Sequence, residues 1–583
     1  MKNFKKIWQL LSKKQQRSML VLFIFMLVGM GLETLGIGLI VPAMILMMQS
    51  DLATKFPEVQ PLLDVIGNPT QEKLIILSML LLLSVYVIKT FFLAFLFWKQ
   101  TSFASLVTID LSQRLFTIYL HQPYSFHLQR NSAQLIHNIT ALVGQTAKSF
   151  TLSLLLLSEI MVLLGVSILL FMVEPIGTLA VLLIFGAVAW LFSLMSRNRI
   201  LEWGSTYNHH EGLRLQRIQE GLGGAKDVKI LGRESSFLKQ YLYHNKSSNE
   251  ALKYQTVLQS MPRLLFELMA VLSLASIVFV MLVQDKTVEI IIPTLGLFAA
   301  AAFRMMPSIN RILGAVQGIR FSLPMVEKLY EEFNTTQLQN NFSSDKAMEF
   351  KEVVKINDIS YKYPSSDTWA LEKISCRVAQ GAFVGFIGSS GAGKSTLVDI
   401  ILGLLQPLKG SISIDGINML ESIRSWQNEV GYVPQSIFLT DDTLMRNIAF
   451  GIPNNKIDKK MVWKALESAQ LKEFVEELPE GLDTVVGERG VRLSGGQRQR
   501  IGIARALYHD PSVLVLDEAT SSLDTATEKG VMDAVRDLKG KKTLIIITHR
   551  LSTVEGCDYL YRLEKGKIVD EGKAVDVIED ILQ

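Results

Sequence analysis

The chain has 583 residues, which is too long for a single hydrophobic core, so two or more domains are expected. Hydrophobic residues make up 49% of it and the mean hydropathy is +0.29, which is high for a soluble protein. The net charge of +4 gives no support for nucleic-acid binding. The two cysteines, Cys376 and Cys557, cannot form a disulfide framework and are expected to be free thiols.

Apolar residues gather before about residue 320 and form runs long enough to cross the ~30 Å hydrocarbon core of a membrane. Six such spans are predicted, at residues 19–48, 74–98, 152–172, 176–194, 264–283 and 290–312. Basic residues before the first span place the N-terminus in the cytoplasm, and an even number of spans returns the C-terminal half there. Buried helices of a large soluble protein are the alternative, and six runs in so short a stretch argue against it.

Two long cytoplasmic connections separate spans two and three and spans four and five. We expect them to extend the spans as helices and to end in short turns or cross-helices near Tyr124–Asn131 and Gly221–Ser235. These ends either contact the C-terminal domain or are solvated. The outer loop Asp51–Thr70 is expected to hold an interfacial helix. The polar composition around 334–350 predicts a linker.

The C-terminal half contains a phosphate-loop motif, G-x-x-x-x-G-K-[ST], between a run of buried-strand type and a helical run. Glycines let backbone N–H groups surround phosphate oxygens, and the helix N-terminus adds partial positive charge. Lys394 is expected to reach the β- and γ-phosphates of ATP, and Ser395 to hold Mg²⁺. A chance glycine-rich turn is the alternative. The residues predicted to bind nucleotide here are Gly388, Ser389, Ser390, Gly391, Ala392, Gly393, Lys394, Ser395 and Thr396.

A second chemical signal is the apolar run 512–516, which is followed by two carboxylates. A strand that ends beside the phosphate loop can supply the carboxylate that organises Mg²⁺, and Asp517 fits this role. Glu518, one residue later, can polarise the attacking water as a general base. From Val353 onward, strand-like and helical runs alternate, which predicts an α/β domain.

The run Leu493-Ser494-Gly495-Gly496-Gln497, together with the phosphate loop, resembles the signature of ABC transporter ATPases. The resemblance extends over residues 353–567. It implies that Tyr363 stacks on adenine, Gln435 joins Mg²⁺ and contacts the membrane domain, and His549 contacts the γ-phosphate. Asp524 matches the turn after the acidic pair. The residues that would close over ATP bound by the opposite subunit are Ser494, Gly495, Gly496 and Gln497.

One ATPase domain, called the motor below, and six spans correspond to half a transporter. The resemblance therefore implies a homodimer that holds two ATP molecules. The expected fold is a helical membrane domain of ABC exporter type followed by an α/β P-loop nucleotide-binding domain. The expected boundaries are 1–333 for the membrane domain, 334–350 for the linker and 351–583 for the nucleotide-binding domain. The predicted location is the cell inner membrane, with the N-terminus and the motor in the cytoplasm.

Basic residues in the predicted spans suggest a substrate. Lys89, Arg263 and Arg304 stand in apolar surroundings and would suit an anionic head such as pyrophosphate if they face the lumen. Internal pairing with glutamates at positions 33, 159 and 267 is the alternative.

Segments around Arg263 and Arg304 resemble bacterial flippases of lipid-linked oligosaccharides, although Lys89 stands where we expect arginine in that family. This resemblance implies ATP-driven outward flipping of a polyprenyl-pyrophosphate-linked glycan. The alternatives are a lipid A or multidrug exporter and, in another class, a membrane-anchored regulatory ATPase without transport.

Overall fold

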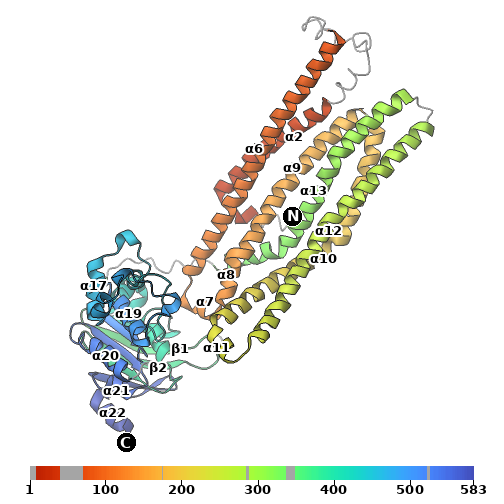
Figure 1. Ribbon diagram of the computed structural model, residues 1–583. Helices are drawn as coiled ribbons and strands as arrows, with labels where there is room; N and C mark the ends of the chain where they lie inside the picture. Colours follow the sequence, from red (N-terminus) through yellow and green to blue (C-terminus); the bar gives the residue numbers. More distant parts are fainter. Residues whose placement is uncertain are drawn as a thin grey trace. The chain divides into compact units, whose positions relative to one another are not determined.

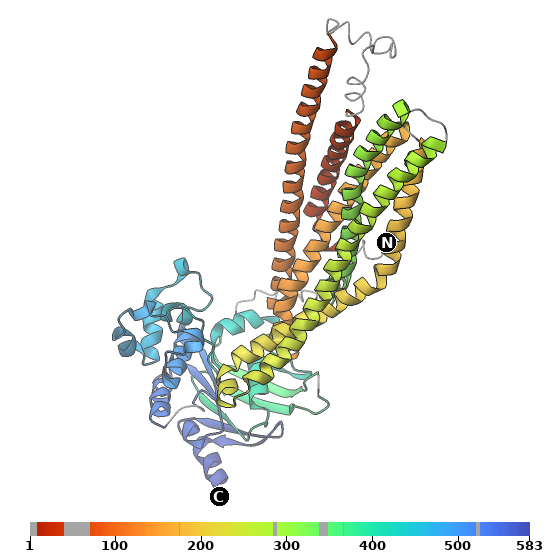
Figure 2. The same ribbon diagram turned by 45° about the vertical axis from the view of Figure 1, so that its right-hand side comes forward.

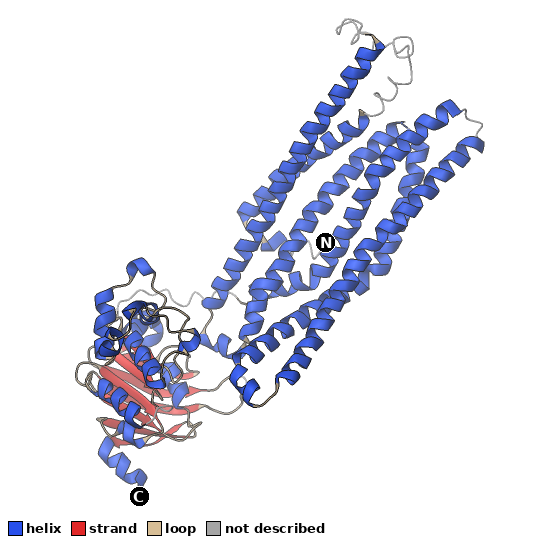
Figure 3. Ribbon diagram, viewed as in Figure 1, coloured by secondary structure: helices blue, strands red, loops and turns tan. Residues whose placement is uncertain are grey.

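The computed structural model of the chain describes residues 8–39, 70–173, 175–283, 288–336, 348–364, 366–520 and 525–582. The chain divides into two compact units. One unit comprises Met1–Gln122 and His127–Leu338, and the other comprises Pro123–Phe126 and Gln339–Gln583. Among the described residues, the strands belong to the second unit (Figure 3). The segment 51–69, where an interfacial helix was expected, and most of the predicted linker lie outside the described residues.

The first unit is a bundle of long helices (Figure 1). Four of them have 48 to 50 residues, which at ~1.5 Å per residue is more than twice the thickness of the hydrocarbon core. The predicted helical extensions of the spans are therefore present. The bounds of the long helices are α2 Lys13–Gly38, α6 Gln71–Leu120, α9 Val143–Val173, α10 Pro175–Gly223, α12 Glu234–Val283 and α13 Val288–Thr335.

Three helical segments of the described residues are long and apolar enough to cross a membrane, namely Lys13–Gly38, Glu72–Leu120 and Ser132–Met172. They contain the second and third predicted spans and residues 19–38 of the first, whose residues 40–48 lie outside the described residues. The other three predicted spans fall in α10, α12 and α13, and parts of these helices lie outside the residues whose side chains are described. The count of six spans therefore stays a prediction.

Short helices occur where cross-helices were predicted. Helix α7 spans Tyr124–Gln129, and α11 spans Ala225–Ile230 at the turn between α10 and α12, which run side by side (Figure 2). Gly232, just after α11, has a φ of 59°, a left-handed conformation that glycine adopts without steric cost. After α7 come α8, Ser132–His137, and a π-helical turn, η2, Asn138–Leu142. Contact of α7 and α11 with the motor stays a prediction.

A buried polar network joins α6, η2 and the end of α13. The Tyr119 hydroxyl donates to Glu332 Oε2 over 3.1 Å and accepts from Asn138 Nδ2 over 3.0 Å. Arg130 forms an ion pair with the same carboxylate, with 2.8 Å between Nη1 and Oε1. Because buried polar groups are costly without partners, this network fixes how the three segments pack.

The described residues of the second unit form two sheets. The antiparallel sheet has the order β2-β1-β4-β5, and the larger sheet has the order β10-β9-β3-β8-β7-β6, with parallel pairing from β9 to β6. This arrangement confirms the predicted α/β domain. The strands are β1 Val353–Tyr361, β2 Leu371–Ala379, β3 Phe383–Ile387, β4 Lys409–Ile414, β5 Ile417–Asn418, β6 Val430–Val433, β7 Val513–Asp517, β8 Thr543–Thr548, β9 Tyr559–Glu564 and β10 Lys567–Lys573.

Helices pack around these strands, and all five residues of β3 and of β7 are buried. Such runs are typical of parallel strands that are covered on both faces. Cys376 in β2 and Cys557 before β9 are free and buried. The helices are α14 Lys394–Ile401, α15 Ile423–Glu429, α16 Leu444–Ile448, α17 Lys459–Ser468, α18 Lys472–Glu476, α19 Gly495–Leu507, α20 Thr525–Arg536, α21 Leu551–Val554 and α22 Ala574–Leu582.

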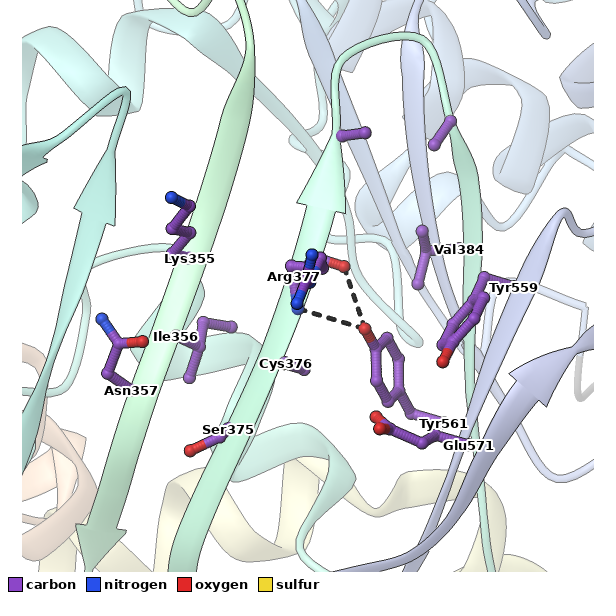
Figure 4. A pocket seen from close by; sticks show the side chains of 12 residues that line it. Lys355, Ile356, Asn357, Ser375, Cys376, Arg377, Val384, Tyr559, Tyr561 and Glu571 are labelled. Carbon is purple, nitrogen blue, oxygen red and sulfur yellow. Dashed lines mark hydrogen bonds between the residues drawn. The ribbon is translucent and has the colours of Figure 1, made fainter.

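A cavity of about 720 Å³ lies where β2 approaches β9 (Figure 4). The Tyr561 hydroxyl accepts a hydrogen bond from the Arg377 backbone N–H and donates one to the Arg377 carbonyl, each over 3.1 Å. These bonds satisfy backbone groups on the side of β2 that has no neighbouring strand. None of the residues that line this cavity belongs to the predicted nucleotide site.

Candidate functional site

The phosphate loop connects β3 to α14, as the motif requires. Gly393, the residue before α14, has a φ of 99°. A Cβ atom there would lie 2.6 Å from the Ala370 carbonyl oxygen, so both backbone conformation and space require glycine. The loop therefore leads directly into the N-terminus of α14, where backbone N–H groups are free to bind phosphate.

Lys394 lies folded across the loop. Its side chain is only 5% exposed, and Nζ donates to the carbonyl oxygens of Gly388 and Ser389 over 2.9 and 3.0 Å. The Tyr363 hydroxyl lies 3.0 Å from Thr396 Oγ1, so the residue predicted to stack on adenine is attached to the first turn of α14. The structure thus brings Tyr363 and the phosphate loop together.

Glu518 lies at the carboxyl end of β7 with a φ of 45°, and its N–H donates to the Ile547 carbonyl of β8 over 2.8 Å. Gln435 Nε2 donates to Glu518 Oε2 over 2.9 Å. Glu518 Oε1 lies 3.3 Å from His549 Nδ1 and 3.9 Å from Lys394 Nζ. Gln435, His549 and Lys394, from three other parts of the sequence, therefore converge on the Glu518 carboxylate.

Asp517, beside Glu518, is 8% exposed, and its Oδ1 atom has no hydrogen-bond partner among the described residues. Burial, and then the charge of Glu518, raise the pKa of Asp517 above its usual range. Burial, and then Asp517, raise the pKa of Asp399 to about 6. The Tyr432 hydroxyl is 3.5 Å from Asp517 Oδ2. Crowded carboxylates with an unpartnered oxygen fit a hard divalent cation such as Mg²⁺. The exposed Ser395 lies one turn before Asp399 on α14.

Sequence reasoning missed Asp399 and Tyr432. Asp399 follows Ser395 by four residues, so it lies one turn later on α14. Tyr432 precedes Gln435 by three residues and lies in β6, which pairs with β7. The helical spacing could have pointed to Asp399. The position of Tyr432 depends on strand order, which the sequence motif does not show.

The signature residues form the start of α19. Ser494 is the N-cap of this helix: its Oγ accepts from the Gln497 N–H, and the Gln497 side chain accepts from the Ser494 N–H over 2.7 Å. In the part of the chain that the structure describes, each of these side chains bonds to the backbone N–H of the other residue rather than to the phosphate loop. Gly495 and Gly496 are the first two residues of α19. Asp524 lies outside the described residues.

Two of the three predicted substrate residues form ion pairs. Lys89 Nζ lies 2.8 Å from Glu33 Oε2, with side chains that are 12% and 7% exposed. Arg263 Nε lies 2.9 Å from Glu267 Oε1, and both of these side chains are exposed. Arg304 lies in α13, but its side chain is outside what the structure describes. Lumen binding by these residues stays a prediction.

Comparison with known proteins gives two family matches. Residues 19–305 match the ABC transporter transmembrane region, and residues 371–521 match the family described as ABC transporter. An ATP-dependent lipid A-core flippase of Alkalilimnicola ehrlichii is 30% identical over 502 residues, which cover 83% of this chain and 84% of the flippase. The chain belongs to the ABC transporter family. It carries one membrane region and one ATPase region, the composition of an exporter half-transporter, and its ATPase is coupled to transport.

Two further relatives carry the same description as the Alkalilimnicola ehrlichii protein. The ATP-dependent lipid A-core flippase of Coxiella burnetii is 29% identical, with 80% of this chain and 79% of the relative covered. A flippase of the same description from Ralstonia nicotianae is also 29% identical, with 82% of each chain covered. A bacterial Atm1-family ABC exporter with ATP bound has a similar structure, with a TM-score of 0.77 at 23% identity over 97% of this chain and 96% of that one.

The structural match confirms the predicted exporter fold. The narrower resemblance to flippases of lipid-linked oligosaccharides is not supported, because the relatives with these matches are lipid A-core flippases. The description of these relatives favours the alternative of a lipid A exporter over an exporter of lipid-linked oligosaccharides.

Proposed function

We propose that two copies of this chain form an ATP-driven exporter that moves a phosphorylated lipid, such as lipid A, from the cytoplasmic to the outer leaflet of the cell inner membrane. The convergence of Lys394, Gln435 and His549 on Glu518 carries the proposal, because it provides the groups that ATP hydrolysis needs. The similarity to lipid A-core flippases over most of the chain supports a lipid as the cargo.

In this proposal Glu518 accepts a proton from the water that attacks the γ-phosphate. Gln435 and His549 hold the two oxygens of its carboxylate in place, so its lone pairs are oriented before substrate arrives. Lys394 exchanges the loop carbonyls for phosphate oxygens when ATP enters. Bringing Lys394 to the phosphate neutralises charge that develops during transfer.

Ser395, Asp517 and Gln435 would hold Mg²⁺, which supplies charge neutralisation at the β- and γ-phosphates. The signature residues Ser494–Gln497 of one subunit would cover ATP bound to the loop of the other. The N-terminus of α19 suits this role, because Ser494 at its start is exposed. The positive end of the helix dipole and the backbone N–H groups there would attract a γ-phosphate.

Turnover in lipid nanodiscs tests the proposal. ATP hydrolysis by the purified protein is measured in a neutral host lipid, with lipid A or a polyprenyl-pyrophosphate glycan added. Flipping of a fluorescent lipid A is measured in proteoliposomes, with Glu518→Gln as the matched inactive control. Stimulation of ATP hydrolysis by lipid A, together with ATP-dependent flipping of lipid A, would support the proposal. Stimulation by the glycan alone would restore the lipid-linked oligosaccharide as the cargo, and indifference to both lipids would favour a regulatory ATPase.

A further inference from the structure

Three segments of the motor meet at one carboxylate, that of Glu528 in the first turn of α20. Its side chain is 13% exposed. Glu528 Oε1 accepts hydrogen bonds from the hydroxyls of Thr520 and Thr553, over 3.2 and 3.1 Å, and both threonines are buried. Glu528 Oε2 accepts from Arg550 Nη1 over 2.6 Å. Glu528 therefore uses both of its oxygens to join the segment that follows β7 to the segment that follows β8.

The residues that bind Glu528 stand next to the two side chains that meet in the proposed hydrolytic site. Thr520 follows Glu518 by two residues, and Arg550 follows His549 directly. Glu518 Oε1 and His549 Nδ1 lie 3.3 Å apart. Glu528 thus holds the chain just beyond each partner of this contact.

The pairing of β7 with β8 fixes these two segments up to the same contact. The parallel ladder ends at Asp517 and Ile547, and the Glu518 N–H adds one bond to the Ile547 carbonyl over 2.8 Å. Beyond this point both segments leave the sheet. Hydrogen bonds to an ionised carboxylate are stronger than those between neutral groups. The Glu528 carboxylate is therefore well suited to fix the spacing of the two segments where the sheet no longer does so.

We propose that Glu528 is a positioning residue for ATP hydrolysis, which sets the spacing between the Glu518 carboxylate and the His549 imidazole by binding the residues that follow them. The inference rests on the proposed roles of Glu518 and His549 and does not depend on which lipid is exported. Misplacement of a catalytic group by about 1 Å can lower a rate by on the order of 10²-fold. A carboxylate that restrains both segments can therefore affect turnover without contacting the nucleotide.

Basal ATP hydrolysis by the full-length protein in nanodiscs of a neutral lipid, without added cargo, tests this role. Glu528→Gln keeps the shape of the side chain but removes the charge that pairs with Arg550. The kcat is expected to fall about tenfold, while the KM for ATP stays within about twofold, because the phosphate loop is unchanged. Asp533→Asn is the matched control, since Asp533 lies on the same helix and pairs with Arg536 over 3.5 Å. Both constants are expected to stay within about twofold in this control.

The same substitution in a His549→Ala background separates positioning from a general loss of stability. Without the imidazole there is no Glu518–His549 spacing to set, so Glu528→Gln is expected to lower the single-turnover rate of His549→Ala by less than about twofold. Thr520→Val removes one of the two hydroxyl donors to Glu528. It is expected to lower kcat about threefold when His549 is present, and by less than about twofold when it is absent. This second variant provides the test if Glu528→Gln does not fold.

An unchanged kcat in Glu528→Gln would overturn the inference. An equal fractional loss in the wild-type and His549→Ala backgrounds, or a change in KM alone, would overturn it as well. If Glu518→Gln and His549→Ala reduce turnover while Glu528→Gln does not, the positioning role fails and the proposed hydrolytic site stands. Wild-type turnover in both Glu518→Gln and His549→Ala would refute the proposed site together with the inference. Lipid A that neither stimulates hydrolysis nor is flipped would refute only the proposed cargo.

Discussion

Gln435 and Glu518 are joined by a hydrogen bond of 2.9 Å between the amide Nε2 and the carboxylate Oε2. The two residues follow β6 and β7, which are neighbouring parallel strands. The amide therefore fixes one oxygen of the proposed general base, while His549 contacts the other.

Replacing Glu518 by Gln removes the proton acceptor but keeps the shape of the side chain. Steady-state ATP hydrolysis is expected to fall by at least about 10²-fold, because general-base catalysis contributes that much or more. ATP binding, measured with a fluorescent analogue, should be retained. Glu421→Gln, an exposed carboxylate of the same domain, serves as the control. Turnover near the wild-type rate in Glu518→Gln would show that another group accepts the proton.

The sharing of ATP between two subunits predicts a specific pattern in tandem-linked dimers. One tandem dimer carries Lys394→Ala in one half and Ser494→Arg in the other, and a second carries both substitutions in the same half. If each ATP lies between the loop of one half and the signature of the other, the two arrangements differ in how many complete sites remain. With the substitutions in different halves, both fall on one site and the other site stays complete. With both in the same half, each site loses one component. ATPase activity should therefore be measurable in the first tandem dimer and absent in the second. The opposite pattern would mean that each chain builds its own site.

Sequence periodicity and contiguous motifs predicted much of this fold. The phosphate loop was identified because nine consecutive residues, Gly388–Thr396, carry its whole chemistry. The helical extensions were predicted from the length and polarity of the connections. The electrostatic influence of Asp517 on Asp399, and the hydrogen bond of Gln435 to Glu518, depend on the order β3-β8-β7-β6 and could not be predicted from local patterns.

The partners of the predicted substrate residues also could not be predicted from local sequence patterns. Hydropathy identified Lys89 as a costly charge, and Glu33 was one of three possible partners. The pairing of α2 with α6 decides which of them it meets. Side-chain direction on a long helix is set by its neighbours in the bundle, and a single sequence does not specify those neighbours.

The Lys89–Glu33 pair predicts a rescue by double substitution. Lys89→Met removes the ammonium group that pairs with the buried Glu33 carboxylate, and this is expected to lower stability by on the order of 3 kcal/mol. Lys89→Met/Glu33→Gln should recover most of the thermal stability, measured by fluorescence in detergent. If lipid-stimulated ATPase recovers in parallel, the pair is structural. A double variant that is stable but no longer stimulated would show that Lys89 binds the cargo.

A pair of imidazoles predicts how stability depends on pH in the extension formed by α10 and α12. His210 Nδ1 and His244 Nδ1 lie 2.9 Å apart, so one donates and the other accepts. Burial lowers the pKa of both; nearby His209 lowers both further, and Arg217 adds to the effect on His244. A base with a lowered pKa binds fewer protons folded than unfolded. Stability is therefore expected to fall as the pH drops below about 6.5.

Thermal unfolding between pH 5 and pH 7.5 measures this dependence. His244→Gln keeps a polar side chain but removes the second positive charge, so the melting temperature should change less across this range than in the wild type. His121→Gln, an exposed residue just after the end of α6, serves as the control. An unchanged pH dependence in His244→Gln would show that other groups dominate the titration.

The two native thiols have a practical consequence for measuring the transport cycle. Burial raises the pKa of Cys376 and of Cys557 to about 12, so almost no reactive thiolate exists at neutral pH. The natural chain can therefore serve as the background for site-specific labelling. A cysteine placed at Leu222, which is 75% exposed near the end of α10, would accept a spin label selectively. In a homodimer this single substitution provides two probes, and the distance between them would report each opening and closing step.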